Sequence, residues 1–333
     1  MPYFSIIIPV YNRPEEVDEL LNSLTLQTFS DFEVVIIEDG SSIKCDTITK
    51  KYTEHLNVHY FYKENSGRSE TRNFGMDKAE GDYFVFFDSD CVIPPFYFEE
   101  VKKRLSINFT DSYGGPDKAD ESFTNMQKAI NFSMTSFLTT GGIRGSKGTK
   151  MEKFVPRTFN MGFSKEVYST VGGFNDMFGE DIDLSLRIRN QGYTCQLISD
   201  AFVYHKRRVS LRSFYRQVHI FGMARISLFI LHPTSIKLVH VLPALFTIAT
   251  ILILLLSIIY PFLLIPLIVY YSLIFILSSM EYKKISIGFL SILTSAIQLY
   301  GYGWGFIKSY IKKIMMKKKQ DVKEELSKYY NKK

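Results

Sequence analysis

Two carboxylates one residue apart, Asp88 and Asp90, end an apolar run that begins at Tyr83. A short, continuous apolar run is typical of a strand buried on both faces, and open α/β sheets bind ligands beyond the carboxyl ends of their strands. The oxygen atoms of such a pair suit a divalent cation that also binds phosphate. The spacing therefore predicts a cation and phosphate site, with two solvated turn aspartates as the alternative.

Further acids and one histidine stand at the ends of other predicted elements. Asp39 follows an apolar run, Glu180 and Asp181 open a predicted helix, and His205 comes shortly before the apolar C-terminal third. Each has a simpler explanation as a turn residue, a helix-start acid favoured by the dipole, or a surface histidine. Taken together, these residues indicate a constellation of metal-binding and proton-transfer groups.

Strands and helices alternate along the first part of the chain. Predicted strands cover residues 5–10, 32–37, 58–62, 83–87, 154–164 and 195–198, and predicted helices cover residues 15–27, 46–52, 69–78 and a segment from 180. This alternation predicts an α/β fold with a mostly parallel sheet. Residues 182–188 also alternate like a strand, but the acids in their first turn favour a helix. No G-x-G-x-x-G follows the first run, which argues against a dinucleotide-binding fold.

Charge and composition point to a membrane and not to nucleic acid. The chain has 333 residues, 46% of them hydrophobic, and a net charge of +6. Residues 308–333 hold ten lysines against three acids, so the basic excess lies beside an apolar segment and should face anionic lipid. Scattered cysteines indicate a reducing compartment. The N-terminal apolar run is too short for a signal peptide, so the first domain is expected in the cytoplasm.

The apolar C-terminal third predicts membrane helices. From Leu238 to Met280 there is no Asp, Glu, Lys or Arg, which suits two spans that turn near Tyr260 and Pro261. Residues 285–307 are again uncharged. A third span places the lysine-rich tail outside, against the positive-inside bias, whereas a re-entrant or interfacial segment keeps the tail inside. The second option is favoured by glycines that weaken a regular helix there: Gly301, Gly303 and Gly305.

These patterns divide the chain into four predicted parts. Residues 1–212 form the α/β domain, and residues 213–235 an amphipathic interfacial helix, with a soluble core helix as the alternative. Residues 236–307 form a membrane segment of two or three helices, and residues 308–333 a basic cytoplasmic tail. A glycine-rich stretch at 141–148 suits either a lid over a site or an ordinary surface loop.

Five motifs carry a resemblance to a known family. They are SIIIPVYN at 5–12, IEDGSS at 37–42, NSGRSETRNFG at 65–75, FDSD at 87–90, and GGFN with GEDIDL at 172–184. Their set and order resemble the family 2 inverting glycosyltransferases of GT-A (Rossmann-like) fold. The C-terminal apolar segments are similar to those of membrane-anchored bacterial members that build exopolysaccharide or lipid-linked glycans. The resemblance implies an enzyme at the cell (inner) membrane with its catalytic domain in the cytoplasm.

The resemblance also implies residues for the sugar donor. Asp39 would accept a hydrogen bond from the nucleotide base, and Arg72 would contact the base or the diphosphate. The whole implied nucleotide-sugar-binding set is Pro9, Tyr11, Asp39, Arg72, Asp88 and Ser89. Asp88, Asp90 and His205 would hold Mg²⁺ or Mn²⁺ on the diphosphate, where the cation acts as a Lewis acid as the nucleoside diphosphate leaves.

For the acceptor, the resemblance implies Asp181 as the general base, which takes the proton from the attacking hydroxyl. One direct displacement then inverts the configuration of the sugar. Asn160 and Glu180 would lie on the acceptor side. The expected acceptor is a membrane-held, lipid-linked glycan. A polyprenyl phosphate acceptor, or a non-catalytic scaffold that binds a nucleotide sugar, are the alternatives.

Three departures from the family pattern bear on these expectations. Glu38 replaces the commoner first aspartate of the second motif, while Asp39 is kept. Cys91 stands where many relatives have a third acid, which removes one possible metal ligand. No Gln-x-x-Arg-Trp follows Asp181. Because that motif accompanies processive polymerases, transfer of a single sugar is expected.

Overall fold

The computed structural model describes residues 3–118, 123–141, 155–206 and 209–316. The chain divides into a first unit, residues 1–120 with 148–206, and a second unit, residues 121–147 with 207–333. The boundary differs from the predicted one because residues 125–135 pack against the C-terminal helices. The predicted lid lies outside the described residues, apart from its first glycine.

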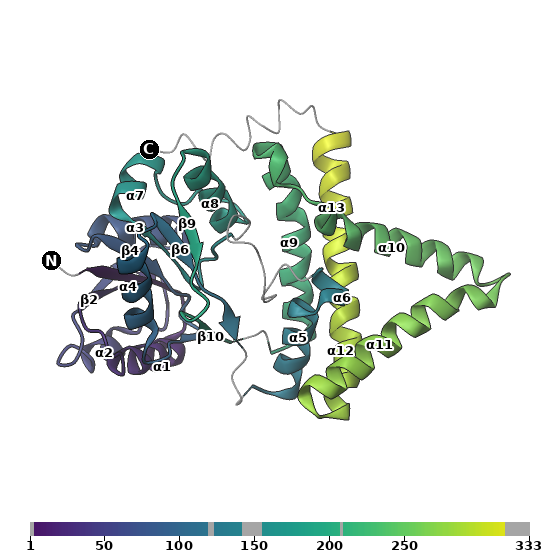
Figure 1. The fold of residues 1–333 in the computed structure, drawn as a ribbon, viewed down its shortest axis with the longest axis horizontal. Coiled ribbons are helices and arrows are strands. Elements are labelled where there is room, and N and C mark those ends of the chain that lie inside the picture. Colours follow the sequence, from purple (N-terminus) through teal and green to yellow (C-terminus); the bar gives the residue numbers. More distant parts are fainter. Residues whose placement is uncertain (1–2, 119–122, 142–154, 207–208, 317–333) are drawn as a thin grey trace. The chain divides into compact units, whose positions relative to one another are not determined.

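Within the described residues, the first unit contains a mostly parallel sheet of seven strands in the order β3-β2-β1-β4-β8-β6-β9 (Figure 1). β1 lies between β2 and β4 and runs parallel to both, so the three carboxyl ends meet at one edge. β8 runs antiparallel between β4 and β6. The strands are β1 (Phe4–Val10), β2 (Phe32–Asp39), β3 (Val58–Lys63), β4 (Tyr83–Phe86), β6 (Ser112–Gly114), β8 (Met161–Ser164) and β9 (Cys195–Leu197). The predicted fold class is confirmed.

Helices cover both faces of this sheet, because alternate residues of a strand point to opposite sides. Ile6 and Ile8 of β1 belong to one buried cluster, which contains residues of α1 and α4. Ile7 belongs to the other cluster, which contains residues of α3, α7 and α8. The helices of this unit are α1 (Pro14–Thr25), α2 (Asp46–Lys50), α3 (Arg68–Lys78), α4 (Tyr97–Ile107), α7 (Lys165–Val171) and α8 (Glu180–Asn190).

The ambiguous segment from residue 180 is helical, as predicted. Leu184 and Ile188 lie four residues apart on one helix face and pack into the same buried cluster. The acids Glu180, Asp181 and Asp183 occupy the first turn, where the helix dipole favours negative charge. The predicted strand at 154–164 is too long, because β8 begins only at Met161 and the described residues before it form an isolated bridge.

A small second sheet lies at the end of the central strand. β5 (Cys91–Val92) follows β4 directly and pairs antiparallel with β10 (Val203–His205), which pairs parallel with β7 (Asp117–Lys118). The register places His205 opposite Cys91. A histidine more than a hundred residues downstream is therefore held beside the Asp88–Asp90 segment by backbone pairing.

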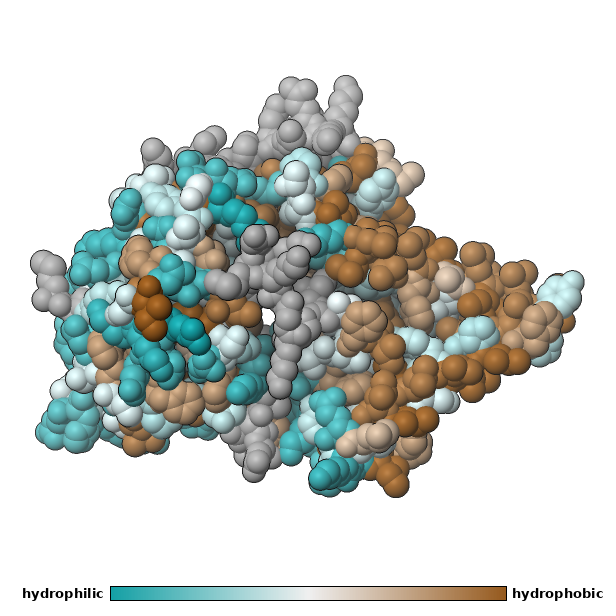
Figure 2. Space-filling view, viewed as in Figure 1, coloured by the Kyte–Doolittle hydropathy of each residue, from teal (hydrophilic) through white to brown (hydrophobic). Residues whose placement is uncertain are grey.

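The second unit is helical. Its described elements are α5 (Asn125–Thr135), α6 (Phe137–Thr140), α9 (Leu211–Leu231), α10 (Leu238–Leu256), α11 (Ile265–Tyr282), α12 (Ile285–Ala296) and α13 (Tyr302–Tyr310). Among the described residues, three helical stretches are long and apolar enough to cross a membrane: Leu238–Leu256, Pro261–Tyr282 and Ile285–Met315. Figure 2 shows hydrophobic residues covering the visible surface of α10 and α11. The unit is therefore consistent with membrane association.

The third apolar segment is helical in spite of its glycines, although the helix is not regular throughout. The chain stays helical from Ile285 to Met315, with π-helical turns at Ile297–Gly301 and Ile311–Met315. The glycines lie where neighbouring helices approach closely. A Cβ atom on Gly303 would stand 2.4 Å from the Pro243 carbonyl oxygen of α10, and one on Gly305 would stand 2.2 Å from the His219 carbonyl oxygen of α9. These glycines permit helix packing and do not break the helix.

Replacing Gly303 by leucine should lower the melting temperature of the detergent-solubilised protein. The new side chain has to displace the backbone of α10, and overpacking of this kind costs about 1–3 kcal/mol. The matched control is Trp304→Leu, on the same helix at an exposed position. An unchanged melting temperature in the Gly303 variant would show that α10 and α13 are not in close contact.

Candidate active site

The end of the central strand carries the predicted Asp-x-Asp pair. The carboxylate of Asp88 accepts a hydrogen bond from an Arg72 terminal nitrogen at 2.7 Å, and its side chain is one-third exposed. Ser89 is buried. Asp88 is therefore anchored to α3 on one side and still accessible, whereas Ser89 presents little surface to a ligand.

Asp90 and His205 face each other across the paired strands β5 and β10. The Asp90 Oδ1 and His205 Nε2 atoms are 3.1 Å apart, and the other Asp90 oxygen lies 3.7 Å from an Arg13 nitrogen. The His205 ring stacks on Phe159, with centroids 4.9 Å apart, which fixes its orientation. A carboxylate oxygen and an imidazole nitrogen this close form a fitting pair of ligands for a divalent cation such as Mn²⁺.

Cys91 is close to this pair but poorly suited to bind a hard cation. Its ligand atom lies within 4.8 Å of those of Asp90 and His205. However, the thiol is fully buried and lies 3.6 Å from the Phe159 carbonyl oxygen. Burial raises the pKa of the Cys91 thiol well above its ordinary value, so it stays protonated. Asp90 and His205 remain the better ligand candidates.

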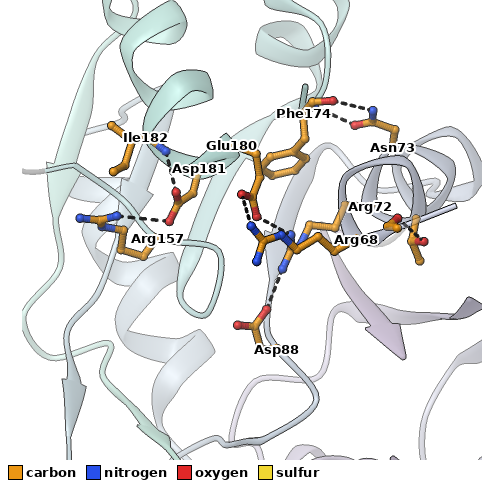
Figure 3. Close-up of polar contacts among 11 residues, drawn as sticks. Arg68, Arg72, Asn73, Asp88, Arg157, Phe174, Glu180, Asp181 and Ile182 are labelled. Carbon is orange, nitrogen blue, oxygen red and sulfur yellow. Dashed lines mark hydrogen bonds and ion pairs between the residues drawn. The ribbon is translucent and has the colours of Figure 1, made fainter. Parts of the chain in front are cut away.

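Glu180 lies between two arginines of α3 (Figure 3). One carboxylate oxygen is 2.8 Å from Arg68 and the other 3.2 Å from Arg72. Glu180 is only 3% exposed. Burial and the neighbouring Asp181 raise the pKa of its carboxyl group, and the two guanidinium groups oppose this rise. Because Arg72 also binds Asp88, a continuous line of contacts joins the Asp-x-Asp segment to the start of α8.

Asp181 occupies the first turn of α8, directly after this buried acid. One of its oxygens accepts a hydrogen bond from its neighbour's backbone N–H at 2.8 Å, and the other lies 3.5 Å from an Arg157 nitrogen. Its side chain is 16% exposed, so it is more accessible than Glu180. Figure 3 shows Asp181 and Asp88 on either side of Arg72 and Glu180. An accessible carboxylate in this position can accept a proton from a bound hydroxyl group.

The predicted base-binding residue, Asp39, ends β2 at the same edge of the sheet. It is buried and accepts hydrogen bonds from Lys63 and from the backbone N–H groups of Ser66 and Gly67. Burial disfavours its ionisation, but the hydrogen bonds from Lys63, Ser66 and Thr71 outweigh burial and lower the pKa of the carboxyl group. Asp39 is thus an ionised anchor for the 65–75 motif as well as a candidate ligand for a base.

The predicted residues at the end of β1 are differently placed. Pro9 is half-buried in the strand, while Tyr11 is 54% exposed and free to stack on a ligand. The adjacent Asn12 was not predicted to matter. Its side-chain oxygen accepts hydrogen bonds from the backbone N–H groups of Ser42 and Ile43, so it ties the ends of β1 and β2 together.

Asn160, which was predicted to lie on the acceptor side, presents no surface to a ligand in the structure. It is fully buried. Its side-chain oxygen accepts a hydrogen bond from the Tyr97 hydroxyl at 2.6 Å, and its amide nitrogen donates to the carbonyl oxygens of Ala201 at 2.8 Å and Pro116 at 3.3 Å. With no exposed surface, Asn160 joins α4 to the loops before β7 and β10. These contacts give Asn160 a structural role, and its place on the acceptor side stays a prediction.

Replacing Asn160 by alanine should therefore reduce stability without a specific effect on acceptor binding. Removing its amide leaves buried hydrogen-bonding groups without partners, at a cost of about 1–3 kcal/mol. Chemical denaturation of the variant, compared with Asn190→Ala at an exposed position, measures this cost. A stable variant with a raised KM for acceptor alone would restore the original prediction.

Sequence reasoning missed several basic residues of the site. Arg68 could have been found, since it lies four residues before Arg72 in the same motif and therefore on the same helix face. Lys63 ends a strand with no motif around it, and Arg157 lies in a stretch without periodicity. Their contacts depend on long-range packing, which the sequence pattern does not reveal.

Comparison with other proteins identifies relatives. A family model described as Glycosyl transferase family 2 matches residues 5–172. Glycosyltransferase AglE of Haloferax volcanii is 26% identical over 259 residues, which cover 73% of this chain and 79% of that protein. An uncharacterized glycosyltransferase of Rickettsia felis is 28% identical over 204 residues, 57% of this chain but only 33% of that relative's length.

A solved structure has a similar fold. The mannosyltransferase PcManGT from Pyrobaculum calidifontis, in complex with GDP-Man and Mn²⁺, superposes with a TM-score of 0.52 at 17% identity. The match covers 68% of this chain and 64% of that one. At this identity, the likeness supports the shared fold and not a shared substrate.

Proposed function

This chain belongs to glycosyl transferase family 2, and from that premise we propose that it transfers one sugar, with inversion, from a nucleotide diphosphate sugar to a membrane-held glycan acceptor. The observation that carries this proposal is the line of contacts from Asp88 through Arg72 and Glu180 to the position of Asp181. It joins the predicted donor residues to the predicted base at one edge of the sheet.

Each side chain then has a defined task. Asp39 binds the base, Tyr11 offers its exposed ring to the nucleotide, and Arg72 contacts the base or the diphosphate. Asp90 and His205 hold Mg²⁺ or Mn²⁺, which neutralises charge on the leaving nucleoside diphosphate when bound. Asp181 accepts the proton of the acceptor hydroxyl as it attacks the anomeric carbon, and the single displacement inverts that carbon.

The apolar helices of the second unit support a membrane-held acceptor, such as a lipid-linked glycan. An enzyme and an acceptor confined to one surface meet more often and in fewer orientations than two partners in solution. We place the catalytic unit at the cytoplasmic face of the cell membrane, where nucleotide sugars are made and where cysteines stay reduced.

A donor panel tests this proposal. The purified protein in detergent is mixed with Mn²⁺ and UDP-, GDP- or dTDP-sugars, and the donor is identified by the largest rise in melting temperature. That donor should then be consumed, by transfer or slow hydrolysis, and EDTA should stop turnover. Failure of every donor to bind or turn over would favour the non-catalytic scaffold.

A polyprenyl phosphate acceptor is a second candidate, favoured by the guanidinium of Arg157 beside Asp181. Arginine binds phosphate well, and a phosphate nucleophile needs no strong base. The two candidates differ in their response to Asp181→Asn, because only a hydroxyl acceptor depends on proton removal.

A further inference from the structure

α10 and α11 form an apolar hairpin, and the residues around its apex, 251–269, are mostly exposed. The described contacts of α10 with the C-terminal helix are made by Pro243, Thr247 and Thr250 in its first two-thirds. Those of α11 include Tyr270, which donates a hydrogen bond to the Leu138 carbonyl oxygen of α6, and Ser278, which lies 2.5 Å from Ser291 of α12. Tyr271 also donates a hydrogen bond to the Tyr300 hydroxyl. Figure 1 shows the two helices extending away from the long C-terminal helix and meeting at an apex, which lies between the end of α10 at Leu256 and the start of α11 at Ile265.

The hairpin apex exposes large apolar side chains. Ile258 is 80% exposed, Ile259 70% and Phe262 63%. No Asp, Glu, Lys or Arg occurs between residues 238 and 280, whereas Lys283 and Lys284 follow the end of the hairpin at once. A surface of this kind suits lipid hydrocarbon, with the lysines at the level of the headgroups.

The direction of α9 relative to α13 restricts the topology. The two helices pack along each other: Val218 lies against Gly301, the Met223 carbonyl accepts a hydrogen bond from Ser309 at 3.2 Å, and Ser227 accepts one from Lys313 at 2.7 Å. Along this contact, the residue numbers of the two helices increase in the same direction. α9 and α13 therefore run parallel.

A hairpin that returns to its starting side brings the chain back to the side on which α9 ended. If the hairpin returns in this way, α9 and the helix Ile285–Met315 could both cross the membrane only by running in opposite directions. Since the two helices run in the same direction, they cannot both cross the membrane in this case. Since they pack against each other along their length, one of them cannot cross while the other lies flat on the surface. The arrangement that remains has both helices lying along the membrane surface.

Two further observations agree with this arrangement. α9 carries three arginines, Arg212, Arg216 and Arg225, and is not among the stretches apolar enough to span. α12 packs against α5, since Thr294 donates a hydrogen bond to the Ala129 carbonyl oxygen at 3.0 Å. The chain passes from the first unit into the segment that contains α5, residues 121–147, and then returns to the first unit.

The long C-terminal helix also has a suitable apolar stripe. Six of its exposed large apolar residues recur at intervals that keep one helix face: Ile285, Phe289, Leu293, Trp304, Ile311 and Met315. A helix lying in the interface buries such a stripe among the lipids.

From these observations we propose a monotopic topology, which rests on the membrane association proposed above. The α10–α11 hairpin enters the membrane from the side of the catalytic unit and returns to it. α9 and Ile285–Met315 lie along that surface. The lysine-rich tail therefore stays on the catalytic side, and the conflict between a third span and the positive-inside bias disappears.

Single cysteines test this topology in sealed vesicles of each orientation. In a Cys195→Ser background, where the remaining Cys45 and Cys91 are buried, Ser286→Cys and Lys312→Cys mark the two ends of the long helix at exposed positions. Asn190→Cys reports the side of the catalytic unit. A membrane-impermeant maleimide should label all three from one side.

Labelling of Lys312→Cys from the opposite side to Asn190→Cys would overturn the monotopic topology and establish a third span. Release of the protein by alkaline carbonate would instead refute the membrane association on which the topology rests. The donor panel is independent of both results, so failure of the topology and failure of the catalytic proposal are distinguishable.

Discussion

Replacing Asp181 by asparagine is expected to reduce sugar transfer by about 10²–10⁴-fold, the usual contribution of general acid–base catalysis. The amide keeps the shape of the side chain but cannot take the proton of the acceptor hydroxyl. The first turn of α8 and the Glu180 contacts to Arg68 and Arg72 do not depend on this carboxylate. Donor binding, measured as the rise in melting temperature with nucleotide sugar and Mn²⁺, should therefore persist.

The matched control is Asp176→Asn, an exposed acid five residues earlier, which should leave transfer unchanged. Nearly full activity of the Asp181 variant towards a polyprenyl phosphate would identify phosphate as the nucleophile. Full activity towards a hydroxyl acceptor would remove Asp181 from the mechanism altogether.

The sheet could be predicted because its pattern is local. Ile6, Ile7 and Ile8 are all fully buried, with alternate residues in two different clusters, and a strand covered on both faces reads as an unbroken apolar run. The start of α8 could also be predicted from a local pattern. Three acids in its first turn indicated a helix, although the apolar residues of 182–188 alternate as in a strand. The carboxylates at the strand ends then follow, because parallel strands end at a common edge.

The contacts among these side chains could not be predicted from the sequence. Glu180 looks like any acid at a helix start, and only the packing of α8 beside α3 buries it between Arg68 and Arg72. Asn160 looks like a polar residue near a site, yet the loops that end at Pro116 and Ala201 enclose it completely. In both cases the decisive partners are between about forty and more than a hundred residues away along the chain.

The glycines at and just before the start of α13 show the same limit in the second unit. As local signals, Gly301, Gly303 and Gly305 argue against a regular helix, because glycine lowers helix propensity. In the structure their missing side chains allow α9 and α10 to approach the helix backbone. The stabilisation from close helix packing outweighs the low helix propensity of glycine. That stabilisation exists only when the neighbouring helices are in place.

Asp90→Asn is expected to abolish the effect of Mn²⁺ on nucleotide binding and to reduce transfer by about 10²-fold or more. A bound cation contributes several kcal/mol of charge stabilisation to a departing phosphate group, and about 1.4 kcal/mol corresponds to tenfold in rate. An amide is a weaker ligand than a carboxylate. Asp90 and His205 face each other at 3.1 Å, so His205→Ala should also reduce transfer and the effect of Mn²⁺ on nucleotide binding. The reduction should be smaller than in Asp90→Asn, because the charged ligand is kept.

Melting temperatures measured with and without nucleoside diphosphate and Mn²⁺ separate this effect from a loss of stability. Asp200→Asn, at an exposed position of the same unit, should behave like the parent protein. In the Asp90 variant the stabilisation that needs both Mn²⁺ and nucleotide should vanish, while the melting temperature without either stays close to the parent value. A variant that keeps the Mn²⁺-dependent rise would show that the cation is bound elsewhere, and Asp88, with its one-third exposed carboxylate, would then become the leading ligand.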